Sequence, residues 1–177
     1  IVLLTTDLGS DGSPAPSGRA DPVAQMRTVE RSLKAGAALR MKPPAAAVLT
    51  EIASGWLSRC QFGSNGYRSI LDFMLPGETF LSPRYSGSTE SIVAISYARL
   101  REVEYPSGPV QSPAHILLCQ LALVASQSEN ARLAERLVSI GRRDAFERMA
   151  HFFLELASRS RAKAMGGGMV FACPLTQ

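Results

Sequence analysis

Hydrophobic residues recur at alternating three- and four-residue intervals through the last third of the chain. This spacing keeps one face of a continuous helix apolar, and Gly141 follows the last position of the row. The row consists of Ile116, Cys119, Leu123, Ser126, Asn130, Leu133, Leu137 and Ile140. Because apolar side chains gain free energy when they leave water, this row, called the seam below, predicts a helix over 111–141 that pairs with a second helix.

A second helix is expected directly after Gly141. Asp144 can accept from the free N–H groups of the new first turn while Glu147 reaches back, and the loss of this cap should cost about 1 kcal/mol. The helical pattern continues to about Met165, where three glycines end it, and a short strand is expected over 169–172. Four residues form one apolar face that predicts core packing, namely Met149, Phe152, Phe153 and Leu156.

Short apolar runs separated by turn residues fill the region 27–107. Asn65 and Gly66 lie between two of these runs and are the strongest short signal for a hairpin, because both residues tolerate the positive φ of a tight turn. We therefore expect 56–62 to pair with 67–74. Further strands are expected over 49–52, 92–95 and 100–103. Several short strands at this spacing are typical of a β-sandwich or barrel.

Length and composition suit one ordinary domain with an appendage. The chain has 177 residues and 46% hydrophobic content, which is enough to bury a core. Residues 1–22 are rich in Gly, Ser, Pro and Ala and predict a flexible leader. The longest apolar run, 116–125, is about half of the roughly 20 residues that a membrane span needs, so no membrane segment is expected.

Cysteine and histidine usage argues against a metal, a cofactor or a catalytic centre. Cys60, Cys119 and Cys173 are odd in number and far apart, which favours a reducing cytoplasm over a disulfide framework. No CxxC pair is present for zinc or an iron-sulfur cluster. His115 and His151 lie outside 27–107, so a metal-dependent enzyme on a β-barrel lacks its ligands, and a nucleophilic hydrolase lacks its base.

The chain carries a net charge of +4, and much of the excess lies between residues 132 and 163. A basic stretch of this kind is compatible with a neighbouring nucleic acid. A solvated helix face is the more common reason for such a stretch, so the charge does not establish a nucleic-acid partner.

Five sequence segments resemble Crp/Fnr transcription regulators and occur in the order of that family. They are GWL at 55–57, YRSILDFMLPGE at 67–78, SIVAI at 91–95, GRRDAFERMAHFFLEL at 141–156 and PLTQ at 174–177. The resemblance covers about 27–177 and is closest to the FixK-like branch, whose members lack a cofactor. It implies a mainly β fold with added helices, in which a double-stranded β-helix of the cyclic-nucleotide-binding type forms the sensor.

The resemblance also implies a domain order. The β-barrel sensor would occupy 23–110, the dimerisation helix 111–141, and the start of a winged helix-turn-helix domain 142–177, the remainder of that domain being missing. Thr176 and Gln177 would open the DNA-binding helices. In this family a homodimer presents two recognition helices to a palindromic DNA site. RNA polymerase is a further expected partner of the full-length protein.

Six residues of the seam are expected to form the dimer interface: Ile116, Leu123, Asn130, Leu133, Leu137 and Ile140. A polar residue at an inward position lowers the stability of a helix pair but specifies its register, which suggests that Asn130 meets its copy across the two-fold axis. The alternative is that the seam turns toward the β-domain at Asn130.

The candidate effector pocket follows from the same resemblance. Cyclic-nucleotide binders of this superfamily hold the ribose with a Gly-Glu pair, which matches Gly77 and Glu78, and the cyclic phosphate with a later arginine. Ser88 and Thr89 occupy the place of that arginine, and Arg84 comes several residues early. Without a guanidinium a buried phosphate loses charge-assisted hydrogen bonds, so a cyclic nucleotide is not the expected effector.

Cys173 precedes Pro174 at the entrance to the expected DNA-binding helices. An exposed thiol beside basic residues can be oxidised to a bulky or charged group that obstructs DNA binding, although a small apolar residue at a strand end is the simpler interpretation. The expected function is thus the sensor and dimerisation portion of a regulator. The alternative is a dimeric module that binds a small ligand or a protein and has no DNA function.

Overall fold

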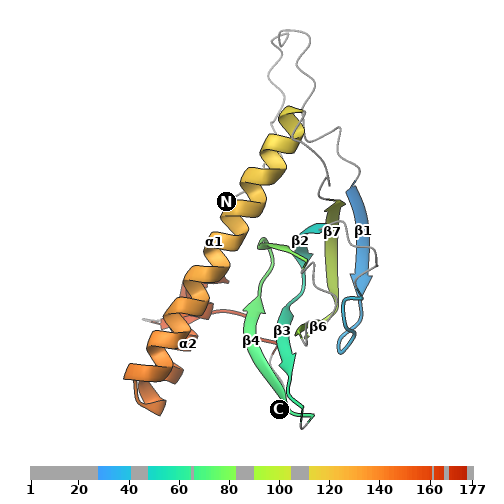
Figure 1. Ribbon diagram of the computed structural model, residues 1–177. Coiled ribbons are helices and arrows are strands. Elements are labelled where there is room, and N and C mark those ends of the chain that lie inside the picture. Colours follow the sequence, from blue (N-terminus) through green and yellow to red (C-terminus); the bar gives the residue numbers. More distant parts are fainter. Residues whose placement is uncertain are drawn as a thin grey trace, which may run out of the picture.

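The computed structural model describes residues 28–40, 48–64, 66–82, 90–104, 112–160, 162–165 and 168–174. Seven strands form two antiparallel sheets, called the β-roll below, and two helices follow (Figure 1). One sheet has the order β1-β7-β2-β5 and the other β4-β3-β6. The strands are β1 (Thr28–Leu33), β2 (Val48–Ser54), β3 (Leu57–Phe62), β4 (Arg68–Met74), β5 (Thr79–Leu81), β6 (Glu90–Ala94) and β7 (Ala98–Glu104).

Both sheets contribute their inner faces to one apolar core. Successive side chains of a strand point to opposite faces of its sheet, so each sheet can turn one face toward the other. The core contains Leu33, Leu39, Ile52, Leu57, Met74, Phe80, Ile92, Ala94, Ala98 and Leu100. The expected strands over 49–52, 92–95 and 100–103 are confirmed within β2, β6 and β7. Strands β1 and β5 were not expected from the sequence.

The predicted hairpin at Asn65-Gly66 is confirmed. Strands β3 and β4 pair antiparallel from Leu57 opposite Met74 to Phe62 opposite Arg68. The connection is longer than a two-residue turn: the Gly66 N–H donates to the Gly63 carbonyl at 3.0 Å, and Gly66 has a φ of +79°. Asn65 itself lies outside the described residues. A glycine with positive φ after an ordinary turn is a common way to close a longer hairpin.

Gly55 allows the chain to pass from one sheet to the other between β2 and β3. Its φ is +84°, and a Cβ atom at this position would lie 2.2 Å from the carbonyl oxygen of Tyr97. On the far side of the crossing, the Trp56 N–H donates to the Ser96 hydroxyl at 3.0 Å. The close approach of two backbones therefore requires glycine at residue 55.

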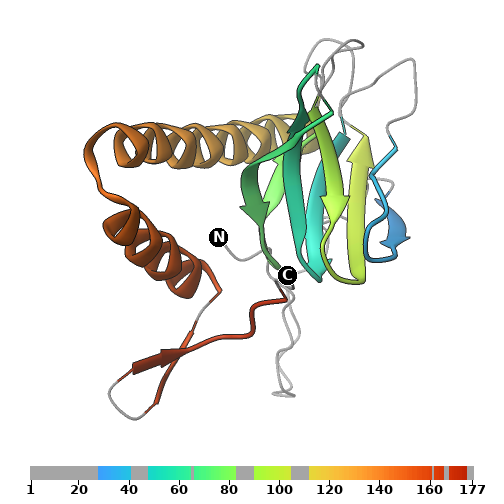
Figure 2. The ribbon, with the colours of Figure 1, turned by 90° about the horizontal axis from the view of Figure 1, so that it is seen from below.

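Helix α1 (Pro113–Arg142) begins at Ser112, whose side chain accepts from the His115 N–H at 3.2 Å. Proline in the first turn costs no hydrogen bond there. Leu118 and Ala122 are buried against the β-roll, where they pack with Leu49. From this contact the helix extends past the β-roll (Figures 1 and 2). It includes Gly141 and ends at Arg142, one residue later than expected.

Helix α2 (Ala145–Arg159) confirms the predicted cap. The Glu147 N–H donates to Asp144 Oδ1 at 2.8 Å, and the Asp144 N–H donates to Glu147 Oε2 at 3.1 Å. The expectation that helix continues to Met165 is wrong. The chain leaves the helix after Arg159 and forms a two-stranded hairpin from β8 (Lys163–Met165) and β9 (Gly168–Val170), which places the expected short strand at 168–170.

The expected core face of α2 is only half correct. Leu156 is buried and Phe152 is half-buried, and both pack against Trp56 and Leu75 of the β-roll. Met149 and Phe153 are exposed. The reason is the direction of α2, which approaches the β-roll with its carboxyl-terminal end (Figure 2).

Two expectations concern the chain as a whole. The leader 1–22 lies outside the described residues, and the domain boundaries stay predictions. Within the described ranges, no helix has the length and apolar character needed to span a membrane.

Candidate sensor site and helical interface

Gly77 and Glu78 lie in the turn between β4 and β5. Gly77 has a φ of +85°, which glycine adopts without strain. Backbone hydrogen bonds tie the turn to β2: the Gly77 N–H donates to the Ile52 carbonyl at 2.8 Å, and the Ile52 N–H donates to the Glu78 carbonyl at 2.9 Å. The Leu75 N–H donates to Glu78 Oε2 at 2.9 Å, so the carboxylate is oriented by its own turn.

The partner of the Glu78 carboxylate is an arginine of α2. Arg159 Nε donates to Glu78 Oε1 at 2.8 Å, and Nη2 donates to Oε2 at 2.9 Å. This arrangement is the parallel, two-bond pairing that a planar guanidinium makes with a carboxylate. The acid that was expected to line an effector pocket is therefore paired with the last residue of α2.

Asp72 of β4 forms ion pairs with arginines of both helices and is only 1% exposed. Arg132 Nε of α1 donates to Oδ2 at 3.0 Å, and Arg136 Nη2 of α1 donates to Oδ1 at 2.6 Å. Arg159 Nη1 of α2 lies 3.7 Å from Oδ1. A buried carboxylate is stable only when its charge is paired in this way. Asp72 thus fixes two helices against one strand.

A second ionic group lies between β3, β6 and α1. Arg59 is buried, its Nη2 donates to Glu129 of α1 at 3.0 Å, and its Nη1 lies 3.5 Å from Glu90 of β6. Burial raises the pKa of Glu129, and the nearby charges of Arg59 and Arg132 offset this only in part. Ion pairs within the chain thus occupy the junction of the β-roll and α1.

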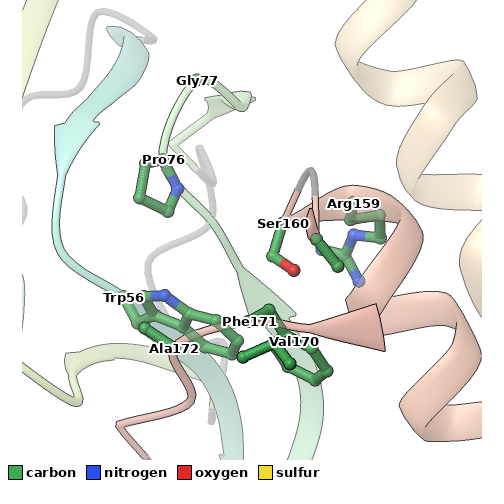
Figure 3. A pocket seen from close by; sticks show the side chains of 9 residues that line it. Trp56, Pro76, Gly77, Arg159, Ser160, Val170, Phe171 and Ala172 are labelled. Carbon is green, nitrogen blue, oxygen red and sulfur yellow. The ribbon is translucent and has the colours of Figure 1, made fainter. Parts of the chain in front are cut away.

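An open cavity of about 760 Å³ lies beside the Glu78–Arg159 pair (Figure 3). The side chains of Trp56 and Phe171 lie along one side of it, and Arg159 and Ser160 lie on the other. The other lining residues are Pro76, Gly77, Ala162, Val170 and Ala172. Most of this wall is apolar, and its charged group already pairs with Glu78.

The seam of α1 faces away from the β-roll for most of its length. Its large side chains are strongly exposed, at 51% for Ile116, 58% for Leu123, 72% for Leu137 and 69% for Ile140. Asn130 is exposed, Leu133 is half-buried, and the neighbouring Glu129 is directed to the β-roll instead. A row of exposed Leu and Ile on one helix face is the usual mark of a surface that another chain covers.

Comparison with known proteins identifies relatives of this arrangement, although no family model matches the chain. Over 112 residues it is 32% identical to the nitrogen fixation regulation protein FixK of Azorhizobium caulinodans, a match that covers 62% of this chain and 44% of FixK. The structure of FixK2 from Bradyrhizobium japonicum has a TM-score of 0.67 at 23% identity, with 85% of this chain and 74% of FixK2 covered. A CRP/FNR family regulator from Thermus thermophilus has a TM-score of 0.57 at 19% identity, with 80% and 71% covered. The chain is thus similar in sequence to FixK and has the fold of CRP/FNR regulators.

The fold expected from the sequence is therefore confirmed: a β-roll of the cyclic-nucleotide-binding type is followed by a long helix, as in CRP/FNR regulators. The chain spans less than half the length of FixK in the match. The c-di-GMP responsive regulator CLP of Xanthomonas campestris shares the fold at a TM-score of 0.61 and 13% identity, over 80% of this chain and 73% of CLP. At this identity the likeness shows the fold and not the ligand.

Several residues that the Crp/Fnr resemblance singled out lie outside the described ranges: Arg84, Ser88, Thr89, Thr176 and Gln177. Gly77 and Glu78 are described, and Cys173 is exposed near the end of the described chain. The roles of all these residues stay predictions. The parts of the chain that are described contain no cluster of three potential metal ligands.

Sequence reasoning missed the arginines and carboxylates that hold α1 and α2. Asp72 lies inside the motif that carried the resemblance, but its partners are 60 or more residues away. One local signal was available, because Arg132 and Arg136 are four residues apart and so share one face of α1, beside Glu129. Helical spacing alone does not tell such a charged face from a solvated one, because the acidic partner Asp72 lies on a distant strand.

Proposed function

We propose that this chain is the sensor and dimerisation portion of a Crp/Fnr-type regulator that binds palindromic promoter sites in DNA as a homodimer. The observation that carries the proposal is that the two faces of α1 have different surroundings. One face is attached to the β-roll through Leu118, Ala122 and the arginines, while the seam is exposed along the same helix. The similarity to FixK supports the rest, since FixK is a nitrogen fixation regulation protein.

Pairing of the seams of two protomers would bury their exposed Leu and Ile side chains. Complete burial of a Leu or Ile side chain is worth about 1.5–3 kcal/mol, and each protomer would contribute several. An aspartate in such an interface places a charge in an apolar contact at a cost of several kcal/mol. Because each substitution occurs twice in a symmetric dimer, two substitutions introduce four charges and should abolish pairing.

Sedimentation velocity of two matched variants tests the interface. Leu133→Asp with Leu137→Asp places two charges in the seam, whereas Ser128→Asp with Ala131→Asp places two charges on exposed positions of the same helix outside it. Wild type and the second variant should sediment as dimers, and the first as a monomer with an unchanged circular dichroism spectrum. A dimer in the first variant would remove the seam of α1 from the interface.

DNA recognition is tested with the full-length protein. Selection from a random duplex library should return sites with two-fold symmetry, because a symmetric dimer presents the same DNA-binding domain twice. Recovery of asymmetric sites would contradict the proposal.

We also propose that the protein is located in the cytoplasm and that RNA polymerase is a further partner of the full-length protein. The alternative, a binding module without a DNA function, is not favoured by the similar proteins, which are transcription regulators.

Oxidation of Cys173 is a further part of the proposal. The exposure of its thiol supports access by peroxide. Peroxide should weaken binding of the full-length protein to its selected site, and Cys173→Ser should prevent the loss. Equal losses in the two proteins would refute a role for this thiol.

A further inference from the structure

The guanidinium of Arg159 is surrounded by acceptors. Beyond its two bonds to Glu78, Nη1 donates to Glu155 at 2.6 Å, and Nη2 donates to the Phe73 carbonyl. Burial by itself would lower the pKa of Arg159, but the hydrogen bond and charge of Glu78, the charge of Asp72 and the hydrogen bond to Glu155 outweigh it and raise that pKa. The side chain is 14% exposed. These contacts engage nitrogen donors on all three corners of the planar group.

The acceptors on the β-roll belong to one short stretch of chain that is held in place without Arg159. The Glu78 carboxylate accepts from the Leu75 N–H of its own turn, and the turn is bonded to Ile52 of β2 on both sides of Gly77. The Phe73 carbonyl and Asp72 belong to β4, immediately before that turn. A preformed set of in-plane acceptors matches a guanidinium, which presents its donors as a rigid fork, better than it matches an ammonium group.

We propose that the β4–β5 turn is a guanidinium-binding site, and that in this chain its occupant is Arg159, which thereby docks α2 on the β-roll. Ligands of the opposite sign are disfavoured, since an anion at this turn would face Asp72, Glu78 and Glu155, and the described cation beside them, Arg159, is already paired. A small guanidinium compound, in contrast, would compete with Arg159. The site concerns the attachment of α2 and does not depend on whether two seams pair.

The protein carries its own reporter for this attachment. Trp56 is the single tryptophan of the chain, and it is buried in a cluster with Leu75 of the turn and Leu156 of α2. Release of α2 would open this cluster to water. Quenching of Trp56 fluorescence by acrylamide therefore measures docking directly.

Chemical rescue provides the decisive experiment. Arg159→Ala should lower the docking equilibrium constant roughly 10- to 100-fold, because it removes charge-assisted hydrogen bonds, and quenching of Trp56 should rise. Millimolar methylguanidinium should restore the protection in this variant, while methylammonium should not. Glu78→Gln introduced into Arg159→Ala should abolish the rescue. Arg148→Ala is the matched control, since Arg148 lies on the exposed side of α2 and donates to the Arg143 carbonyl.

Two results would overturn the proposal. One is wild-type quenching of Trp56 in Arg159→Ala, together with wild-type hydrogen exchange over 145–159. The other is equal rescue by methylammonium, which would show that only charge is needed. Should Arg159→Ala fail to fold, Arg159→Lys keeps the charge, loses the fork and should still increase quenching. A wild-type value for the lysine variant refutes the site. Sedimentation of the same samples reports the seam separately, so failure of one proposal is distinguishable from failure of the other.

Discussion

Replacement of Asp72 by asparagine removes one charge while keeping the shape of the side chain. The carboxylate is almost fully buried and accepts from Arg132 and Arg136 at 3.0 and 2.6 Å. Removal of one partner from a buried ion pair typically costs about 3–5 kcal/mol. Here the arginine side chains are 21% and 22% exposed, so water can partly solvate them once their partner is lost. We therefore expect a loss of about 2–4 kcal/mol in the free energy of unfolding.

Urea unfolding followed by Trp56 fluorescence measures this loss. The midpoint should fall with an unchanged slope, and the melting temperature should drop by roughly 5–15 °C for a chain of this size. Glu30→Gln is the control, because Glu30 is an exposed carboxylate on β1 and its replacement should change stability by no more than about 0.5 kcal/mol.

Apolar replacement of all three charged residues should have the opposite effect. Asp72→Leu combined with Arg132→Met and Arg136→Met removes all three charges together and leaves no unpaired partner among them. Much of the stability lost in Asp72→Asn should return, since well-packed apolar side chains often replace a buried ion pair without loss. A cost below about 1 kcal/mol for Asp72→Asn would refute the assignment, because it would place the arginines in water.

Three further predictions concern single positions. Gly55→Ala should cost about 3 kcal/mol or more in thermal unfolding, because it combines positive φ with a contact of 2.2 Å to the Tyr97 carbonyl, whereas Gly36→Ala has open space and should cost clearly less. Asp144→Ala should cost about 1 kcal/mol and speed hydrogen exchange in the first turn of α2, and wild-type exchange there would contradict the cap. The raised pKa of Glu129 means that the folded state holds this proton more tightly than the unfolded chain, so the contribution of Glu129 to wild-type stability should fall as pH rises above the ordinary pKa of a glutamate. Glu129→Gln lacks that fall, so its unfolding free energy relative to wild type should increase with pH, and a pH-independent difference would refute the effect of burial.

The features that were predicted correctly depend on neighbours in the chain. The hairpin between β3 and β4 is specified by turn residues within a few positions, and the break between the helices by Asp144 and Glu147, three residues apart. Signals of this kind are legible because the physical interaction itself is local.

The features that were missed depend on contacts between distant residues. Strand β1 has the sequence TVERSL, in which only Leu33 is buried, so its placement depends on pairing with β7 about 70 residues later. Glu78 and Arg159 are 81 residues apart, and no local pattern joins them. Met149 and Phe153 were expected in the core because a helical period identifies an apolar face without identifying what covers it. Which part of that face is covered depends on the direction in which α2 approaches the β-roll, and this direction is known only from the tertiary structure.

Helix α1 is attached to the β-roll by two kinds of contact that respond in opposite ways to the solvent. Its first turns are held by Leu118 and Ala122, and its later turns by Arg132 and Arg136. Salts that are excluded from protein surfaces, such as sulfate, strengthen the apolar contact, while any salt weakens the partly exposed ion pairs by screening. A salt such as sulfate can therefore strengthen the attachment at one end of this 30-residue helix while weakening it at the other.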